Sequence, residues 1–450
     1  MTQSAASTPK FTVWHLIYFV WLNIIITTDA GFLAPLISKM MKVFQVSLIE
    51  VSIYISFMTL IPALLIPAFG FIADKFKRVL IIFIAIVSGA LVSSMMTVII
   101  LISLNFVFFA FFGILAAIVN AAIGPAIFSL IVDYVPAKNR AGIIGWMGIA
   151  GTLAIGLGFI VSGIIPGIIF GPNFPLWFPY IFDAVAGFIF AGLIIFLKEP
   201  PRGIQEEGLK ELYKKGGAYE YTLTFDGAKD YIKKPMNQRL LLFEFFVRFR
   251  HAILGTYFIT FLIVNHGFNE FSATNVMFAI FGIQLLGQVY WGNKGDKAFA
   301  TQKDGHLKVM IKTLTVSLFL VTWVFLIPFN FNTFIGISLF ILFALVLSIG
   351  SFFEVGSLPS AGAVMAAVNL PEIRGTANSI TFLVVTIGRA IAVPLFAIIC
   401  VNLLNENYAL TFFLFILFDI PAFLILLSMK KIVVPSIDRI QEVLKSRTTN

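Results

Sequence analysis

The stretch Gly70-Phe-Ile-Ala-Asp74-Lys75-Phe-Lys77-Arg78 lies between two long apolar runs and carries one acidic and three basic residues. A fainter copy, Gly292-Asn-Lys-Gly-Asp296-Lys297, follows 222 residues later. A short charged segment between apolar runs is typical of a loop joining two membrane-spanning helices, because charges are costly inside hydrocarbon. The stretch therefore predicts a helical membrane protein, and its copy predicts an internal repeat.

The composition also indicates a bilayer-embedded chain. Of 450 residues, 59% are hydrophobic and 12% are charged, and the mean hydropathy is +0.99, whereas soluble domains carry about 25% charged residues. The net charge of +9 does not indicate nucleic-acid binding, because the cations flank apolar runs. The lone Cys400 has neither a disulfide partner nor a metal-binding neighbour. No phosphate-binding loop or His-Glu-x-x-His motif occurs, so we expect no metal, no cofactor, no ATP-driven step and no enzymatic activity.

Twelve apolar segments are long enough to cross a hydrocarbon core of ~30 Å. We expect spans at 12–36, 47–71, 79–102, 106–131, 141–164, 178–197, 239–264, 271–292, 309–329, 334–367, 375–402 and 407–429. The tenth is longer than a span requires, and Gly356, Pro359 and Gly362 predict a kink or break within it. The sequence therefore predicts an all-α membrane protein with twelve transmembrane helices.

The distribution of basic residues predicts the orientation. With the N-terminus inside, cytoplasmic segments hold 26 of the 31 lysines and arginines, and the outer loops hold only Lys39 and Lys42. Because basic residues concentrate on the cytoplasmic side, we expect a multi-pass protein of the plasma (inner) membrane with both termini cytoplasmic.

A second pair of related segments supports the repeat. Pro136-Ala-Lys-Asn-Arg140 follows the fourth span, and Pro371-Glu-Ile-Arg374 follows the tenth. The matching positions predict a six-helix bundle at 1–197, a cytoplasmic linker at 198–238, and a second six-helix bundle with a cytoplasmic tail at 239–450. The linker either forms amphipathic surface helices near 204–215 and 225–234 or is a solvated connection.

The residues of the first loop motif suggest physical roles. Gly70 allows a helix to end, and Asp74 either caps a helix start or pairs with a cation such as Arg140. We expect the three basic residues of the motif to bind lipid phosphates and fix orientation: Lys75, Lys77 and Arg78. Simple enrichment of cations on the cytoplasmic side is the alternative explanation.

The twelve spans, the long central loop and the segment GFIADKFKR after the second span resemble the major facilitator superfamily over nearly the whole chain. The resemblance implies two six-helix bundles around a central cavity that opens alternately to either side. It also implies that the loop motif acts as a conformational latch, although Lys77 stands where the family has a glycine. The expected latch residues are Gly70, Asp74, Lys75, Arg78, Arg140, Asp296 and Lys297.

A narrower resemblance is to the spinster branch, which carries lysolipids and sphingolipids. The residues that carry it are Asn23 and Asp29 in span one, Asp133 at the end of span four, and Glu199-Pro-Pro-Arg202-Gly203 after span six. Three positions depart from the branch: Ala30 replaces an arginine, Asn120 replaces a glutamate, and Arg389 replaces an acidic residue. The resemblance therefore implies the architecture more firmly than the lipid substrate.

Ionisable residues inside spans are the candidate site residues, because each costs ~3 kcal/mol or more at mid-bilayer unless it faces a cavity or a partner. In span seven, Glu244 and Arg248 are four residues apart and face one side. His251 lies on nearly the same side, whereas Arg250 points away, either to snorkel or to meet another neighbour. In the family's architecture spans one, four, seven and ten line the cavity, with eleven nearby. The residues expected to converge there are Asp29, Asn120, Arg248, His251, Glu354 and Arg389.

These residues predict a secondary transporter that works by alternating access. We expect proton coupling through Asp29, Glu354 or His251, since such groups can titrate inside a protein cavity. The cations Arg248 and Arg389 predict a small organic anion or an amphipathic, lipid-like substrate, with His251, Glu354 and Asn120 also at the binding site. A structural Arg389–Glu354 ion pair is an open alternative.

Three other functions stay open at this point: a proton-driven efflux pump for hydrophobic drugs, a transporter-like sensor that moves nothing, and a membrane-embedded enzyme. The expected partners are membrane lipids, a small-molecule substrate and the proton gradient. We expect a monomer and no nucleic-acid partner.

Overall fold

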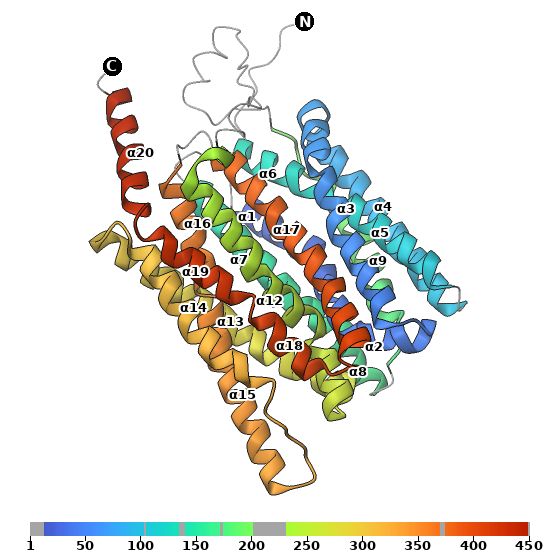
Figure 1. Ribbon diagram of the computed structural model, residues 1–450. Coiled ribbons are helices and arrows are strands. Elements are labelled where there is room, and N and C mark those ends of the chain that lie inside the picture. Colours follow the sequence, from blue (N-terminus) through green and yellow to red (C-terminus); the bar gives the residue numbers. More distant parts are fainter. Residues whose placement is uncertain are drawn as a thin grey trace, which may run out of the picture. The chain divides into compact units, whose positions relative to one another are not determined.

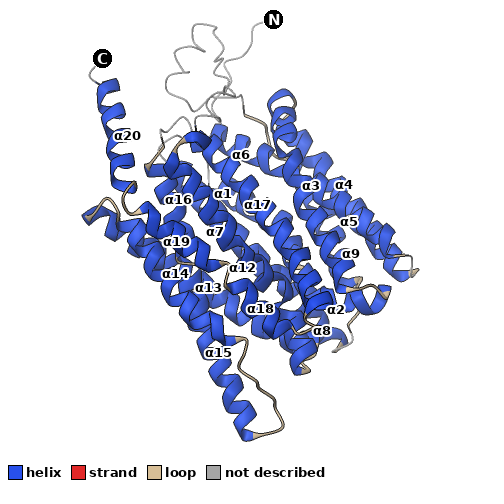
Figure 2. Ribbon diagram, in the orientation of Figure 1, coloured by secondary structure: helices blue, strands red, loops and turns tan. Residues whose placement is uncertain are grey.

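The computed structural model describes residues 13–102, 105–134, 140–171, 174–200, 231–369 and 374–448. Every regular element in these ranges is a helix (Figures 1 and 2). The chain divides into two compact units. Unit 1 comprises Met1–Val46 and Phe57–Thr222, and unit 2 comprises Ser47–Ser56 and Leu223–Asn450.

The first span of unit 1 is bent. The helix α1 (Val13–Thr28) continues as one 3₁₀ turn, η1 (Asp29–Gly31), and then as α2 (Leu33–Phe44), with a bend of 40°. At the bend η1 approaches α7 (Arg140–Phe159) so closely that a Cβ on Gly31 or Gly158 would overlap backbone atoms of the other helix. Only glycine permits such an approach, so these two glycines let the bent span pack against α7.

The remaining helices of unit 1 follow α2 along the chain. They are α3 (Leu48–Lys75), α4 (Arg78–Leu101), α5 (Phe106–Ala121), α6 (Ile123–Tyr134), the π-helical η3 (Ile160–Ile164), α8 (Ile165–Phe170) and α9 (Phe178–Ile194). The helix α4 packs extensively on α9 and α5. At the α4–α9 crossing Gly187 faces Ala90, where an added Cβ would lie 2.9 Å from the alanine's Cβ. Small residues of this kind let helices associate in lipid, where hydrophobic burial supplies no driving force between them.

Unit 2 is built around α12. Its helices are α12 (Pro235–His266), α13 (Glu270–Thr301), α14 (Gly305–Val324), α15 (Phe334–Glu354), α16 (Ser357–Ala367), α17 (Arg374–Ile398), the π-helical η5 (Ile399–Leu403), α18 (Tyr408–Ile416), α19 (Asp419–Met429) and α20 (Val433–Thr448). The hydroxyl of Tyr257 on α12 donates to the carbonyl of Val393 on α17 at 2.8 Å and bonds the Ser52 hydroxyl of α3 at 2.6 Å. These bonds hold the first turns of α3 within unit 2.

The two units interrupt corresponding helices. The fourth span breaks at Ala122, between α5 and α6, and the tenth breaks at Val355 and Gly356, between α15 and α16. The fifth span leads from α7 into the π-helix η3, and the eleventh leads from α17 into the π-helix η5. The first and fifth spans pack together as α1 with α7, and the seventh and eleventh pack together as α12 with α17. Matching breaks and packing partners are what a tandem repeat of one six-helix unit produces.

The predicted break within the tenth span is confirmed, whereas the predicted end of the eighth span is wrong. The tenth span breaks at Gly356 as predicted, while Pro359 and Gly362 lie within the first turns of α16. The eighth span was expected to end at 292, but α13 continues to Thr301, so the second charged motif is helical rather than a loop. Its residues are compatible with a helix, and Gly295 packs where a Cβ would meet His306 and Ser360.

The helices account for the twelve expected spans. Among the described residues, ten helices are long and apolar enough to cross a membrane, the bent pair in the first span makes an eleventh, and the 17-residue apolar helix Phe178–Ile194 is the remaining candidate. The expected linker helices, near 204–215 and 225–234, lie almost entirely outside the described residues. Beyond the last span, Figure 1 shows α20 leaving the end of α19. Its first turns bury Val433 and Ile437.

Candidate functional site

Unit 1 holds two carboxylates within its membrane-spanning helices. Asp29 begins η1, and its Oδ2 accepts a 3.0 Å hydrogen bond from Nδ2 of Asn120, near the end of α5. Asp183 on α9 accepts a 2.6 Å bond from the Ser93 hydroxyl on α4. The two carboxylates lie near enough to act on each other electrostatically. Within the described part of unit 1, neither has a cation as a partner, so both depend on neutral donors.

A buried tyrosine hydroxyl accompanies these acids. Tyr180 precedes Asp183 by one helical turn, and its side chain is 6% exposed. Its ring packs edge-on against Phe32, three residues beyond Asp29, with 6.4 Å between ring centroids. The hydroxyl has no hydrogen-bond partner among the described residues. Since burying an unpaired hydroxyl is costly, this cluster has unused capacity to donate a hydrogen bond.

Unit 2 holds a denser cluster in which Arg250 on α12 is the central cation. Its Nε donates to Glu354 Oε1 at 3.0 Å, and its Nη1 lies 2.6 Å from Asp419 Oδ2. All three side chains are at most 1% exposed. His251, the next residue on α12, places Nδ1 2.7 Å from the same Glu354 oxygen. Glu354 ends α15 and Asp419 begins α19, so both acids lie where the tenth and twelfth spans are interrupted.

The cluster decides between alternatives that the sequence left open for Arg250 and for Glu354. Arg250 does not snorkel toward the membrane surface; it meets buried acids on two other helices. Glu354 pairs with Arg250 and His251 rather than with Arg389. Helical periodicity correctly placed Arg250 away from Arg248, but it could not identify the helices that pack on that side.

The two arginines that the sequence predicted at the binding site, Arg248 and Arg389, have contrasting surroundings. Arg248 donates two bonds to Glu244 Oε2, at 3.1 and 2.9 Å, which confirms the predicted pair along α12. Arg389 on α17 is exposed, and within the described residues no acid pairs with it. Its charge and that of Arg248 act on each other. Because Arg248 is paired with Glu244 and Arg389 is not paired with any described acid, the unpaired guanidinium of Arg389 leaves an excess of positive charge between α12 and α17.

The structure therefore brings the predicted site residues together as three pairs. Asp29 bonds Asn120 in unit 1, His251 contacts Glu354 in unit 2, and Arg248 neighbours Arg389 in unit 2. Two further intramembrane acids also have partners: the Ser93 hydroxyl donates to Asp183, and Arg250 forms an ion pair with Asp419. That all six residues share one chamber stays a prediction.

Among the expected latch residues, Arg78 differs most from its predicted role. It was expected to bind lipid phosphate, but its side chain is buried and forms ion pairs with Asp133 and Glu199. It also donates to the Ser129 hydroxyl at 3.0 Å and to the Pro200 carbonyl at 3.1 Å. Arg78 thereby joins the start of α4 to the end of α6 and to the segment that follows α9.

The other residues of the first motif are described only in part. Lys75 lies 4.4 Å from the ring centroid of Phe71, one turn earlier on α3. Nothing packs near the position of a Cβ on Gly70, which lies inside α3 rather than at its end. The side chains of Asp74 and Arg140 lie outside the described part of the structure, and their expected pairing stays a prediction.

The second motif lies on the exposed end of α13. The Asp296 side chain is 77% exposed, and its Oδ1 lies 3.8 Å from Nε2 of His306. Lys297 is exposed one residue further along. Among the described residues, no group of three or more His, Cys, Asp or Glu side chains is arranged to hold a metal ion.

Apolar spanning helices that carry buried ion pairs define a multi-pass membrane protein. The family model of the Major Facilitator Superfamily matches residues 19–301, and the chain belongs to this superfamily. It is therefore a membrane transporter rather than an enzyme at this level of description. No curated protein matches the chain.

Solved transporter structures share the fold. A bacterial homologue of the human lysosomal transporter Spinster, in an inward-facing and occupied conformation, matches with a TM-score of 0.73 at 16% identity, covering 95% of this chain and 98% of that one. A D-xylose-proton symporter matches at 0.70 and 14% identity, with 94% and 98% covered. The nucleoside transporter NupG matches at 0.67 and 15% identity, with 92% and 99% covered. At these identities the likeness shows the fold alone.

Proposed function

We propose that the protein is a proton-coupled secondary transporter that moves an organic anion, with an amphipathic or lipid-like anion as the preferred class. The observation that carries the coupling is the cluster of Arg250, His251, Glu354 and Asp419. The family membership supports transport, and the charges of this chain support the coupling and the substrate class.

The charge balance of the cluster favours proton uptake. With neutral His251, one guanidinium faces two carboxylates, and the buried group carries a net charge of −1. A proton on His251 makes the cluster neutral, and a net charge at membrane depth is costly. Other charged groups on the packed helices include Arg239, Glu244 and Arg248 on α12, Glu270, Lys294, Asp296 and Lys297 on α13, and Arg374 and Arg389 on α17. A proton that changes this balance can shift a conformational equilibrium only if it binds one state better than the other.

Unit 1 offers a second place for a proton. Asp29 and Asp183 have neutral hydrogen-bond donors and no cation partner among the described residues. Since no cation among the described residues neutralises either carboxylate, a bound proton or a ligand is left for that role. We therefore propose that both Asp29 and Asp183 take part in proton coupling.

A pH jump across proteoliposomes tests the coupling without requiring the substrate. We expect an electrical transient on a solid-supported membrane in the native protein, and its loss in His251→Gln combined with Glu354→Gln. Glu244→Gln is the matched control, because it removes a carboxylate from the same helix outside the cluster, and it should keep the transient. A native protein with no transient and no pH-dependent uptake would exclude coupling.

The substrate class follows from Arg389 and Arg248. An exposed intramembrane arginine without an acidic partner is expensive unless an anion or water meets it, and guanidinium groups bind carboxylate and phosphate through paired hydrogen bonds. A thermal-stability panel should show stabilisation by lysophosphatidic acid and by alkyl carboxylates, but not by the same chains carrying neutral glycerol. Stabilisation by uncharged drugs of many shapes would favour the efflux pump instead, and binding without flux in vesicles would favour the sensor.

The orientation and the latch belong to the same proposal. We place the protein in the plasma (inner) membrane with cytoplasmic termini, because its basic residues lie overwhelmingly on one side of the predicted spans. Asp74 with Arg140, and Asp296 with Lys297, would stabilise one conformational state. The buried Arg78 pairs would keep the helix ends rigid while that state forms. We propose that the transporting unit is a monomer.

A further inference from the structure

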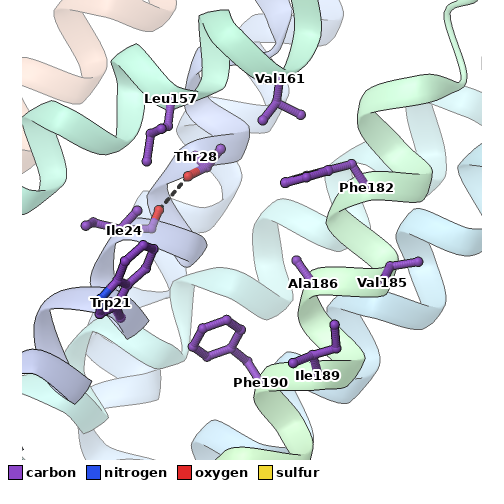
Figure 3. Close-up of a pocket in the computed structure, with 10 residues that line it drawn as sticks. All are labelled: Trp21, Ile24, Thr28, Leu157, Val161, Phe182, Val185, Ala186, Ile189 and Phe190. Atoms are coloured by element: carbon purple, nitrogen blue, oxygen red, sulfur yellow. Dashed lines mark hydrogen bonds between the residues drawn. The ribbon is translucent and has the colours of Figure 1, made fainter. Parts of the chain in front are cut away.

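An apolar groove opens on the side of unit 1, between α1, the α7–η3 helix and α9 (Figure 3). Its volume is about 370 Å³. The lining residues come from all three helices: Trp21, Ile24, Thr28, Leu157, Val161, Phe182, Val185, Ala186, Ile189 and Phe190.

The lining excludes water as the occupant. Only two of the lining side chains carry a polar atom, Trp21 and Thr28, and the Thr28 hydroxyl already donates to the Ile24 carbonyl at 2.7 Å (Figure 3). A bound water needs two to four polar partners, and an apolar cavity of ~150 Å³ stays dry and takes up benzene. An empty groove of this size would also forfeit the dispersion contacts of its walls. Its natural occupant is hydrocarbon.

The groove is continuous with the lipid-facing surface of α9. Val185 and Ile189, on its rim, are 54% and 58% exposed. Two other apolar side chains on the same helix, Phe188 and Leu193, are 45% and 46% exposed. In a protein that spans the membrane, such a surface contacts acyl chains. We propose that the groove is a binding site for one acyl chain of a bilayer phospholipid.

The dimensions fit a single chain. On α1 the lining runs from Trp21 to Thr28, and on α9 from Phe182 to Phe190, which at 1.5 Å per residue is ~10–12 Å. One leaflet of a ~30 Å hydrocarbon core is ~15 Å deep, so the groove takes most of an acyl chain. No charged residue lines it, so the site recognises the chain and not the headgroup.

The bound chain would shield the polar cluster of unit 1. Thr28 and Phe182, at one end of the groove, immediately precede Asp29 and Asp183 in the sequence. Those carboxylates bond Asn120 on α5 and Ser93 on α4, helices that do not line the groove. A lipid chain in the groove completes the apolar wall on the side of α1 and α9, and keeps water from reaching the acids through it.

Brominated phospholipid tests the site, because bromine quenches a tryptophan that it contacts. The protein would keep Trp21 as its single tryptophan, with the other five changed to Phe, and would be reconstituted with increasing fractions of dibrominated phosphatidylcholine. The control keeps only Trp323, which is 58% exposed on α14 and outside the groove. We expect half-maximal quenching of Trp21 at a several-fold lower lipid fraction than for Trp323. Identical curves would overturn the proposal.

A second variant assigns the effect to the groove. Ala186→Phe fills the groove, and the extra quenching of Trp21 should then fall to the level of Trp323. Persistent extra quenching in a folded Ala186→Phe protein would place the lipid elsewhere. Extra quenching by brominated lysolipid but not by the two-chain lipid would also overturn the proposal, since the groove would then belong to an amphipathic solute. If Ala186→Phe does not fold, Leu157→Phe fills the groove from another helix. Native mass spectrometry after delipidation should then find more bound lipid on the native protein than on Leu157→Phe. Equal amounts of bound lipid would overturn the proposal.

Discussion

The two units carry their buried charges in corresponding places but with opposite chemistry. In unit 1, an acid on the first span, Asp29, bonds an amide just before the break in the fourth span, Asn120. In unit 2, a cation on the first span of the unit, Arg250, bonds an acid just before the break in the tenth, Glu354. An aspartate from the last span of each unit belongs to the same group: Asp183 in unit 1 and Asp419 in unit 2.

This difference separates two ways of keeping a charge inside a membrane. Unit 2 pairs its two carboxylates with one fixed guanidinium, and His251 contacts the same Glu354 oxygen as that guanidinium. The described part of unit 1 provides no cation beside Asp29 or Asp183, so these two carboxylates are stable as neutral acids or beside a bound ligand. The comparison predicts that unit 2 depends on its charges for stability, whereas unit 1 depends on its charges for activity.

Removing the central cation of unit 2 should have the largest effect. Arg250→Met leaves Glu354 and Asp419 buried without compensation, which costs about 3–5 kcal/mol when a buried pair loses one member. Thermal unfolding in detergent should show a sharply lowered midpoint or little folded protein. Adding Glu354→Gln and Asp419→Leu to Arg250→Met should recover much of the loss, because no buried ion then lacks a partner. If Arg250→Met alone unfolded like the native protein, the cluster would not be buried as described.

The helix crossings that position the clusters offer the next test. In unit 1 a Cβ on Gly158 would overlap the backbone of η1, whereas in unit 2 a Cβ on Gly388 would lie 3.1 Å from the Phe245 carbonyl oxygen. Gly158→Ala should therefore destabilise by about 1–3 kcal/mol through overpacking. Gly388→Ala needs only a small adjustment, offset by the better helix propensity of alanine, ~1 kcal/mol. Unfolding midpoints of the two variants, measured side by side, check the order, and equal midpoints would contradict it.

The sequence predicted the number of spans because lipid imposes a length and an apolar composition that can be read directly. It also predicted the break at Gly356 and the Glu244–Arg248 pair, since both depend on neighbours within one helix. The partners of Arg250 could not be predicted, because they lie 104 and 169 positions away on helices whose packing the periodicity of α12 does not encode. The burial of Arg78 could not be predicted for the same reason: Asp133 lies near the end of α6, and Glu199 lies in the segment that follows α9.

The end of α13 shows a different limit. Charged residues at 294–297 were taken to mark a loop, but charges also occur on helices that continue beyond the hydrocarbon. The bend at Asp29 was not predicted, because the close approach of Gly31 to Gly158 involves residues 127 positions apart.

Neutralising the acids of unit 1 should change stability little. Asp29→Asn and Asp183→Asn keep an acceptor for Asn120 and Ser93, and no cation in the described residues loses a partner. The free energy of unfolding of each variant, taken from its unfolding midpoint, should lie within about 1 kcal/mol of the native value. The electrical transient after a pH jump should be reduced. A loss of stability as large as that of Arg250→Met would mean that a cation outside the described residues pairs with these acids, and the contrast between the units would fail.

The smallest effect on stability is expected at Arg389, which pairs with no acid in the described structure although it lies near Arg248. Arg389→Gln removes a repulsion between two cations and no ion pair, so unfolding without ligand should change by less than about 0.5 kcal/mol. Binding should respond differently, because a hydrogen bond to a charged group contributes about 1.5–3 kcal/mol, or roughly ten- to a hundredfold in affinity. The affinity for lysophosphatidic acid, measured by titration calorimetry, should fall by that factor in Arg389→Gln and stay unchanged in Lys297→Gln, which removes an exposed cation from the end of α13. Unchanged affinity in Arg389→Gln would show that the unpaired guanidinium of unit 2 does not hold the anion, and the substrate would then have to be sought beside the acids of unit 1.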